Sequence, residues 1–229
     1  MTPDLRLPPG AAVDAEHVWT QTFAAARAPT PRPALFLDRD GVIVEEVAYL
    51  SRPEDVRMVP GAAETIALAN RLNVAVVVVT NQSGIGRGLY GWAEFAAVQA
   101  RILAELAAVG AAVDAVFACP HHDDGFPPYD RADHEARKPN PGMLLRAARM
   151  LPLDLGRSWI VGDRVGDIAA GRNAGIAGGL HVATGYGTDD GQREGALALT
   201  SPAFKALAAP SIADVPRHIP LFVEGRCSN

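Results

Sequence analysis

Short apolar segments alternate with longer segments of helical periodicity from residue 34 onward. The apolar segments are rich in Val, Ile and Leu, and they predict strands over 34–38, 74–79, 113–118, 158–162 and 179–183. Helices are predicted between these strands, over 61–72, 92–109, 141–151 and 166–174. This alternation is typical of an α/β fold in which helices cover both faces of a doubly wound parallel sheet.

The pattern is less regular at both ends of the chain. An amphipathic helix is predicted over Val13–Arg27, and the prolines of "APTPRP" after it indicate an extended linker. A helix is also predicted near Ser201–Ala209, before a last apolar piece, "IPLFV". We therefore expect an N-terminal extension, a core with a loop insert at 119–136, and a C-terminal extension that packs on the core, over residues 1–33, 34–190 and 191–229.

Composition narrows the class of protein. With 48% hydrophobic and 21% charged residues, the 229-residue chain is typical of a soluble globular protein. A net charge of -5 offers no basic patch for nucleic acid. The longest apolar run, Val74–Val79, is too short to span a membrane, and the first residues do not look like a secretory signal, so we expect a cytoplasmic protein. Its two cysteines, Cys119 and Cys227, are then expected to be free thiols.

Acidic residues follow the first core strand. Asp38 and Asp40 are two residues apart, which places both side chains on one side of an extended backbone, and Gly41 allows a sharp turn. Adjacent carboxylates repel unless a cation is shared between them or one stays protonated. A solvated turn with aspartates that cap backbone amides would explain the same residues.

The other strand ends carry complementary groups. Thr80 and Asn81 end the second strand, and the following "GIGRG" lacks the spacing of a dinucleotide-binding loop. Lys138 is held extended by the proline after it, beside a predicted helix start that favours anions, although a solvated lysine is the simpler alternative. Asp163 lies in a loop, where it is a candidate metal ligand, whereas Asp167 begins a helix and is explained equally well by capping. Together these groups match phosphoryl transfer, which needs a nucleophile, a proton donor, Mg2+ and a cation.

With these residues in place, the sequence resembles the haloacid dehalogenase (HAD) superfamily of phosphatases. "DRDG", Thr80, Lys138 and "GDRVGD" match its four motifs over about residues 34–185. Within the superfamily, "TNQSGIGRG", "CPHH" and "RKPNPGM" resemble heptose-bisphosphate phosphatases, and slightly less closely histidinol-phosphate phosphatases. The resemblance implies a Rossmann-like, HAD-like fold, and the chain between the motifs is too short for a full cap domain.

The resemblance also implies roles for individual residues. Asp38 would be the nucleophile, and Asp40 would be the acid and base. Thr80, Asn81 and Lys138 would bind the phosphoryl group. Mg2+ would be held by Asp38, the backbone carbonyl of Asp40, and Asp163. Substrate choice would rest on Arg137 and Arg164, whereas Arg39 should point away from both aspartates.

A zinc-binding loop of these relatives is altered here. Cys119 and His121 match the first ligand pair, but His134 and Ala136 stand where a second pair of cysteines is usual. His122 or Asp133 is near in the sequence and could replace the fourth ligand, so a retained Zn2+ stays an alternative. Because structural zinc usually has four closed ligands, however, we expect a loop held by hydrogen bonds and packing rather than by Zn2+.

The resemblance implies a Mg2+-dependent phosphatase that forms an aspartyl phosphate and acts on a small phosphorylated sugar, most closely a heptose bisphosphate. We expect a monomer or weak oligomer. The alternatives are a histidinol-phosphate or other small-molecule monophosphatase and a non-catalytic binding protein of the same fold.

Overall fold

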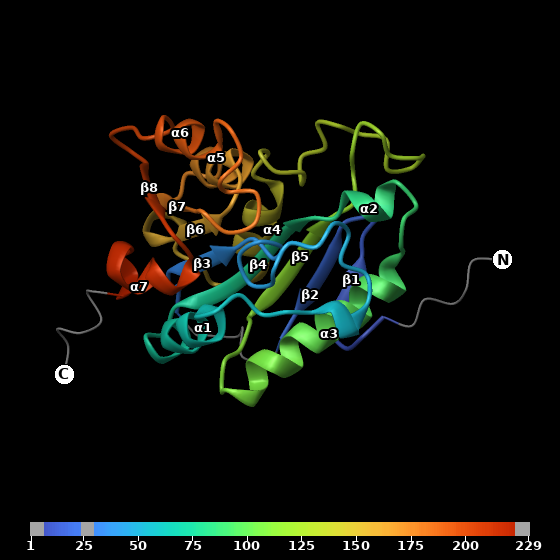
Figure 1. Ribbon diagram of the computed structural model, residues 1–229, viewed down its shortest axis with the longest axis horizontal. Helices are drawn as coiled ribbons and strands as arrows, with labels where there is room; N and C mark the ends of the chain where they lie inside the picture. Colours follow the sequence, from blue (N-terminus) through green and yellow to red (C-terminus); the bar gives the residue numbers. More distant parts are fainter. Residues whose placement is uncertain (1–6, 24–29, 223–229) are drawn as a thin grey trace.

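One eight-stranded sheet organises the chain. The computed structural model describes residues 7–23 and 30–222. The strands are β1 (Ala11–Val13), β2 (Trp19–Thr22), β3 (Ala34–Leu37), β4 (Ala75–Asn81), β5 (Ala115–Cys119), β6 (Trp159–Gly162), β7 (Gly178–Val182) and β8 (Lys205–Ala209). Their order across the sheet is β1-β2-β5-β4-β3-β6-β7-β8 (Figure 1). In this order, the neighbouring strands β5, β4, β3, β6, β7 and β8 are all parallel. β1 and β2 form an antiparallel hairpin, and β2 also pairs with β5 in antiparallel fashion.

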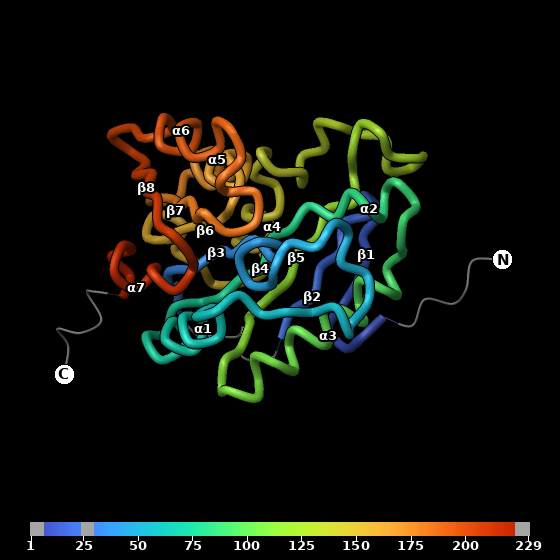
Figure 2. Tube along the Cα trace, in the orientation of Figure 1, coloured from blue at the N-terminus to red at the C-terminus, as the bar shows by residue number. Residues whose placement is uncertain are grey.

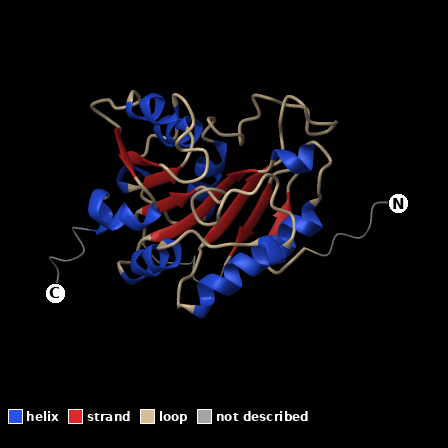
Figure 3. Cartoon of the chain, viewed as in Figure 1, coloured by secondary structure: helices blue, strands red, loops and turns tan. Residues whose placement is uncertain are grey.

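Helices lie against this sheet on both sides (Figure 3). They are α1 (Ala62–Arg71), α2 (Ser83–Gly86), α3 (Trp92–Ala108), α4 (Gly142–Met150), α5 (Val165–Asn173), α6 (Gln192–Leu197) and α7 (Val215–His218), with 3-10 turns η2 (Pro53–Asp55), η3 (Leu155–Arg157), η4 (Ile212–Asp214) and η5 (Pro220–Phe222). None of the described helices is both long and apolar enough to cross a lipid bilayer. The predicted doubly wound α/β core is confirmed, with small shifts at the ends of its elements.

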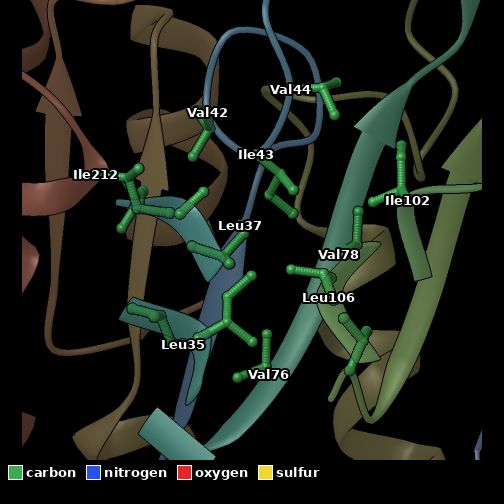
Figure 4. Packing of buried hydrophobic residues seen from close by; sticks show 14 of the residues in the cluster. Leu35, Leu37, Val42, Ile43, Val44, Val76, Val78, Ile102, Leu106 and Ile212 are labelled. Carbon is green, nitrogen blue, oxygen red and sulfur yellow. The ribbon is translucent and has the colours of Figure 1, made fainter. Parts of the chain in front are cut away.

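Alternation along the central strands supplies both halves of the core. Leu35 and Leu37 of β3 face the side covered by α1, α3 and α7, whereas Phe36 faces the side covered by α4, α5 and α6. Figure 4 shows the first side, where Leu35 and Leu37 lie beside Val76 and Val78 of β4. Each such side chain is fully or almost fully buried, which contributes about 1.5–3 kcal/mol. The central strands are therefore firmly held, and they fix the points from which the loops at their carboxyl ends begin.

Two terminal predictions were wrong. The helix predicted over Val13–Arg27 is replaced, in its described part, by the β1–β2 hairpin, which runs beside β5 (Figure 2). The helix predicted near Ser201–Ala209 is replaced by β8, which pairs with β7. Both extensions thus belong to the sheet itself. The predictions that fall on residues 24–29, and on Val223 and Cys227, lie outside the described residues.

The loops that follow the strands hold no cap domain. Residues 38–61 contain the short turn η2, and residues 120–141 contain neither a helix nor a strand. This agrees with the prediction from the sequence, and it leaves the carboxyl edge of the sheet open to solvent along a cleft.

Candidate active site

The predicted strand-end residues come together at one edge of the sheet. β4, β3 and β6 are neighbours, so Thr80, Asp38 and Asp163 leave their carboxyl ends side by side. Lys138 reaches the same place from the loop that precedes α4. All four side chains line a cleft of about 490 Å3. The edge therefore combines carboxylates, a hydroxyl and an ammonium group within one concave surface.

Lys138 is the electrostatic centre of this edge. Its Nζ lies 2.8 Å from an Asp38 oxygen and 2.7 Å from an Asp167 oxygen, and it also donates to the carbonyl of Val79 at 2.7 Å. Burial opposes its charge, but Asp167 and Asp38 outweigh burial and raise the pKa of Lys138. The lysine is therefore a permanent cation beside Asp38.

Asn81 holds this lysine by its backbone. Its Nδ2 donates to the carbonyl of Lys138 at 3.0 Å, and its Oδ1 accepts from the Lys138 amide at 3.1 Å. Both ends of the Asn81 side chain are thus engaged with the protein. These contacts connect β4 to the lysine loop, and the predicted contact of Asn81 with phosphate stays a prediction.

Three carboxylates share the space beside Lys138. One oxygen each from Asp38, Asp163 and Asp167 lies within 4.8 Å of the others. Burial and mutual repulsion raise the pKa of Asp38 to about 7 and that of Asp163 to about 8, because one lysine does not balance three negative charges. The excess charge and the oxygen-only donor set fit a hard divalent cation such as Mg2+.

Glycines allow these carboxylates to approach one another. Gly41 has a φ of +79°, and a Cβ there would lie 2.4 Å from an oxygen of Asp163. A Cβ on Gly162 would lie 2.2 Å from the Cβ of Asp167. A side chain at either position would force a neighbouring acidic residue to shift.

Asp167 has a larger part in the site than the sequence indicated. It does cap α5, since its Oδ2 accepts from the Arg164 amide at 2.9 Å. Its other oxygen, however, pairs with buried Lys138. In the sequence, Asp167 follows Asp163 by four residues, which places it near the same strand end, but helix capping explained this acidic residue equally well.

Asp40 lies apart from the three clustered carboxylates. Its two oxygens accept hydrogen bonds from the Arg39 guanidinium at 2.9–3.1 Å, and one also accepts from Gln82 at 2.9 Å. The expectation that Arg39 points away from both aspartates was therefore wrong. The chain turns at Gly41, so the two-residue alternation of a strand does not continue past Asp38.

Cations surround the mouth of the cleft. Arg137 donates to the carbonyl of His121 at 2.8 Å, and the Arg164 guanidinium stacks 3.8 Å above the ring of Tyr186. Arg87, which the sequence reading passed over, donates to the Tyr49 hydroxyl at 2.6 Å. All three arginines line the cleft. The entrance therefore suits an anionic substrate.

The histidines of the loop insert contact the N-terminal hairpin. The rings of His121 and His134 stack 3.9 Å apart, and each Nε2 lies 2.9–3.0 Å from an oxygen of Glu16. Burial raises the pKa of Cys119 to about 11, which disfavours a thiolate. In the described chain, the groups of side chains close enough to share a metal ion are Asp38–Asp163–Asp167 and the more exposed His122–Asp123–Asp124.

Known proteins share this sequence and fold. A HAD-hydrolase-like family model matches residues 135–209. A D-glycero-beta-D-manno-heptose-1,7-bisphosphate 7-phosphatase of Mesorhizobium japonicum is 49% identical over 165 residues, which are 72% of this chain and 76% of that protein. The chain belongs to the HAD-like hydrolase family, and it is a phosphatase.

Two solved structures support the same assignment. A protein of Mesorhizobium loti assigned as a HAD-like phosphatase superposes with a TM-score of 0.80 at 40% identity, over 91% of this chain and 94% of that one. The D,D-heptose 1,7-bisphosphate phosphatase of B. bronchiseptica, complexed with magnesium and phosphate, gives a TM-score of 0.66 at 33% identity, over 80% and 95% of the two chains. The particular branch of the family that this chain resembles is thus that of the heptose-bisphosphate phosphatases.

Proposed function

We propose that this phosphatase removes the 7-phosphate of D-glycero-beta-D-manno-heptose 1,7-bisphosphate in a Mg2+-dependent reaction. The observation that carries the proposal is the Asp38–Lys138 pair, set among carboxylates at the base of a cleft with a cationic mouth. The substrate follows from the relative at 49% identity, whose name specifies this sugar, this anomer and this phosphate.

In the proposed reaction Asp38 acts as the nucleophile. An oxygen of Asp38 forms a bond to phosphorus while the ester bond to the sugar oxygen breaks, and Asp40 gives its proton to that oxygen. Asp40 then takes a proton from a water molecule, which attacks phosphorus and releases inorganic phosphate from Asp38. Thr80 and Lys138 would bind the phosphoryl oxygens.

Asp38, Asp163 and Asp167, with the backbone carbonyl of Asp40, would hold the Mg2+. The bound cation supplies positive charge where negative charge gathers on the phosphoryl group. The raised pKa values of Asp38 and Asp163 support this role. Above these pKa values the carboxylates have lost their protons and repel one another, and a bound divalent cation relieves that repulsion. The magnesium in the B. bronchiseptica complex supports the same metal.

The second phosphate of the substrate would be bound at the mouth of the cleft. Arg137 and Arg164 are the predicted contacts, and Arg87 lines the same cleft. A substrate with one phosphate would leave some of this positive charge unpaired. Preference for a bisphosphate over histidinol phosphate is therefore the expected consequence.

The test is release of phosphate from a panel of esters, with Mg2+ and with EDTA. The panel contains both anomers of the heptose 1,7-bisphosphate, fructose 1,6-bisphosphate and histidinol phosphate. We expect the highest kcat/KM for the beta anomer, with heptose 1-phosphate as the product and no turnover in EDTA. A higher kcat/KM for histidinol phosphate, or equal values across the panel, would contradict the proposed substrate.

The remaining parts of the proposal concern the state of the protein. A cytoplasmic location fits the buried free thiol of Cys119, and a monomer or weak oligomer fits a cleft built from one chain. Light scattering at several protein concentrations tests the oligomeric state.

A further inference from the structure

A buried group of polar residues surrounds Asp40, and the proposed reaction does not use them. Arg39 is 1% exposed, yet it carries a charge. Its Nε and Nη2 both donate to the Asp40 carboxylate, and its guanidinium lies 5.3 Å from the ring centre of Phe95. Burial of a charge is costly unless it is paired, so Asp40 and the ring hold the arginine, and the arginine in turn holds Asp40.

Gln82 extends this contact to the phosphate-binding threonine. Its Nε2 donates to Asp40 at 2.9 Å and to the Thr80 hydroxyl at 2.8 Å. Its Oε1 accepts from Arg39 at 3.1 Å and from the Tyr90 hydroxyl at 2.5 Å. Because both donors and the acceptor are occupied, the amide has one satisfied orientation.

Tyr90 closes the group on the other side. Burial raises the pKa of its hydroxyl, so the hydroxyl stays protonated and donates to Gln82. The Asp40 side chain, which is 19% exposed, is thus held on its inner side by buried donors while its outer side faces the cleft.

We propose that Arg39, Gln82 and Tyr90 are positioning residues that aim the Asp40 carboxyl group at the leaving oxygen, in register with the phosphoryl group on Thr80. The inference rests on the proposed role of Asp40 as the acid. Proton donation is sensitive to alignment, and an error of about 1 Å in the position of a reacting group can cost about 100-fold in rate. A single amide that bonds both Asp40 and Thr80 fixes their relative position.

The test uses the chemistry of the leaving group. A sugar alkoxide is a poor leaving group and needs the proton, whereas p-nitrophenolate leaves without one. Gln82→Met and Tyr90→Phe should lower kcat/KM for the sugar phosphate by about 10- to 100-fold, which is at or below the low end of what general acid catalysis contributes, because Asp40 is misaligned rather than removed. Both variants should change kcat/KM for p-nitrophenyl phosphate by less than about 3-fold. The ratio kcat/KM is compared because it covers the steps up to departure of the leaving group, whereas kcat also includes attack by water, in which Asp40 acts as the base for either ester. Asp40→Asn should show the same split to a larger extent.

Several controls separate positioning from a general structural role. Tyr129→Phe removes a phenol hydroxyl outside the cleft and should leave the ratio of the two kcat/KM values unchanged. In the background of Asp40→Asn, Gln82→Met should cause no further loss, because both changes act through one group. Tyr90→Phe removes a single oxygen, so it keeps the test valid if Gln82→Met does not fold.

The outcomes are distinct from those of the substrate panel. The sugar phosphate used is whichever ester the unsubstituted enzyme hydrolyses fastest, so a wrong substrate proposal does not affect this test. Equal losses of kcat/KM on both esters would assign the three residues to the phosphoryl step or to the fold. No loss on either ester, or losses that multiply with Asp40→Asn, would also overturn the positioning role.

Discussion

The carboxyl edge of β3, β4 and β6 and the β1–β2 hairpin belong to the same sheet but are held together differently. The carboxyl edge gathers three carboxylates around one lysine, so burial and like charge oppose its own assembly. The hairpin is held by apolar packing, since Trp19 is fully buried and lies 5.5 Å from Trp92 and 5.2 Å from Phe95, between ring centres. Substitutions at the carboxyl edge should change activity more than stability, whereas substitutions in the hairpin should change stability more than activity.

The two regions nevertheless meet through Phe95. Its ring packs edge-on against Trp19 on one side and carries the Arg39 guanidinium on the other. The hairpin therefore supports the floor of the cleft, although it contributes no residue to the cleft lining. The distinction between the two regions would fail if a substitution in the hairpin lowered kcat as strongly as a substitution in the cleft.

The largest effect is expected for Asp38→Asn. Loss of the proposed nucleophile should lower kcat by at least about 10^4-fold, in line with the loss of other enzyme nucleophiles. The unfolding midpoint in EDTA should not fall, because one of three repelling charges is removed. Phosphate release and urea unfolding measure the two quantities, and a variant with undiminished turnover would refute the assignment.

The next largest effect is expected for Trp19→Ala, which should lower stability rather than activity. Removal of a large buried aromatic side chain should lower the free energy of unfolding by about 3–5 kcal/mol. The kcat of the protein that remains folded should fall by less than about 10-fold, since the variant leaves every cleft side chain in place. Phe23→Ala, at the end of the described hairpin and only partly buried, serves as a control with a smaller loss. A kcat loss as large as that of Asp38→Asn would end the distinction between the two regions.

The same contrast explains how far the sequence could predict the molecule. Asp38, Lys138 and Asp163 were placed because each follows a buried core strand or precedes a helix, and parallel strands bring such positions to one edge. The mispredicted segments are the outer strands of the sheet. β8 reads "KALAA", which favours a helix locally, but its pairing with β7 prevails.

Long-range contacts also account for what the sequence missed around the site. Glu16 is 118 residues away from His134, and Arg39 is 43 residues away from Gln82. No local pattern links such partners. Periodicity predicts which strand a side chain follows, but it does not predict which distant side chain will form a hydrogen bond with it.

A third prediction concerns pH and metal. Burial and repulsion raise the pKa of Asp38 and Asp163 from 3.8 to about 7 and about 8, so without metal the folded protein binds protons more tightly than the unfolded chain does. Their contribution to stability is therefore present at low pH and is lost as the pH rises from about 4 to about 8. Mg2+ should restore more stability at pH 8 than at pH 5, because protons compete with the metal.

Urea unfolding at pH 5, 6.5 and 8, with Mg2+ and with EDTA, measures this dependence. Asp163→Asn is the matched control, since it removes one of the titrating groups. The unsubstituted protein in EDTA should lose more stability between pH 5 and pH 8 than Asp163→Asn does. Identical pH dependence in the two proteins would show that burial and repulsion do not raise the pKa of Asp163 in solution.

The smallest effect is expected where the hairpin touches the loop insert. The His134 Nδ1 accepts from the Ala136 amide at 3.1 Å, so its Nε2 carries the proton that is donated to Glu16 at 3.0 Å. Burial lowers the pKa of His134, which leaves the ring neutral at pH 7 and makes this contact an ordinary hydrogen bond rather than an ion pair. A glutamine oxygen can accept the same bond, and the ion pair of Glu16 with Arg131 is exposed and contributes little, so Glu16→Gln should be nearly neutral.

Glu16→Ala, by contrast, leaves the fully buried His134 without its acceptor and should cost about 1 kcal/mol. The substrate side should respond as well, because Arg137 is anchored on the carbonyl of His121, whose ring stacks on His134. We therefore expect a rise of about 2- to 5-fold in KM with little change in kcat, as for a loss of uniform substrate binding. Urea unfolding and steady-state kinetics of the two variants measure this difference. If Glu16→Gln loses as much as Glu16→Ala, the charge of Glu16 matters at pH 7, and electrostatic contacts as well as apolar packing hold the hairpin.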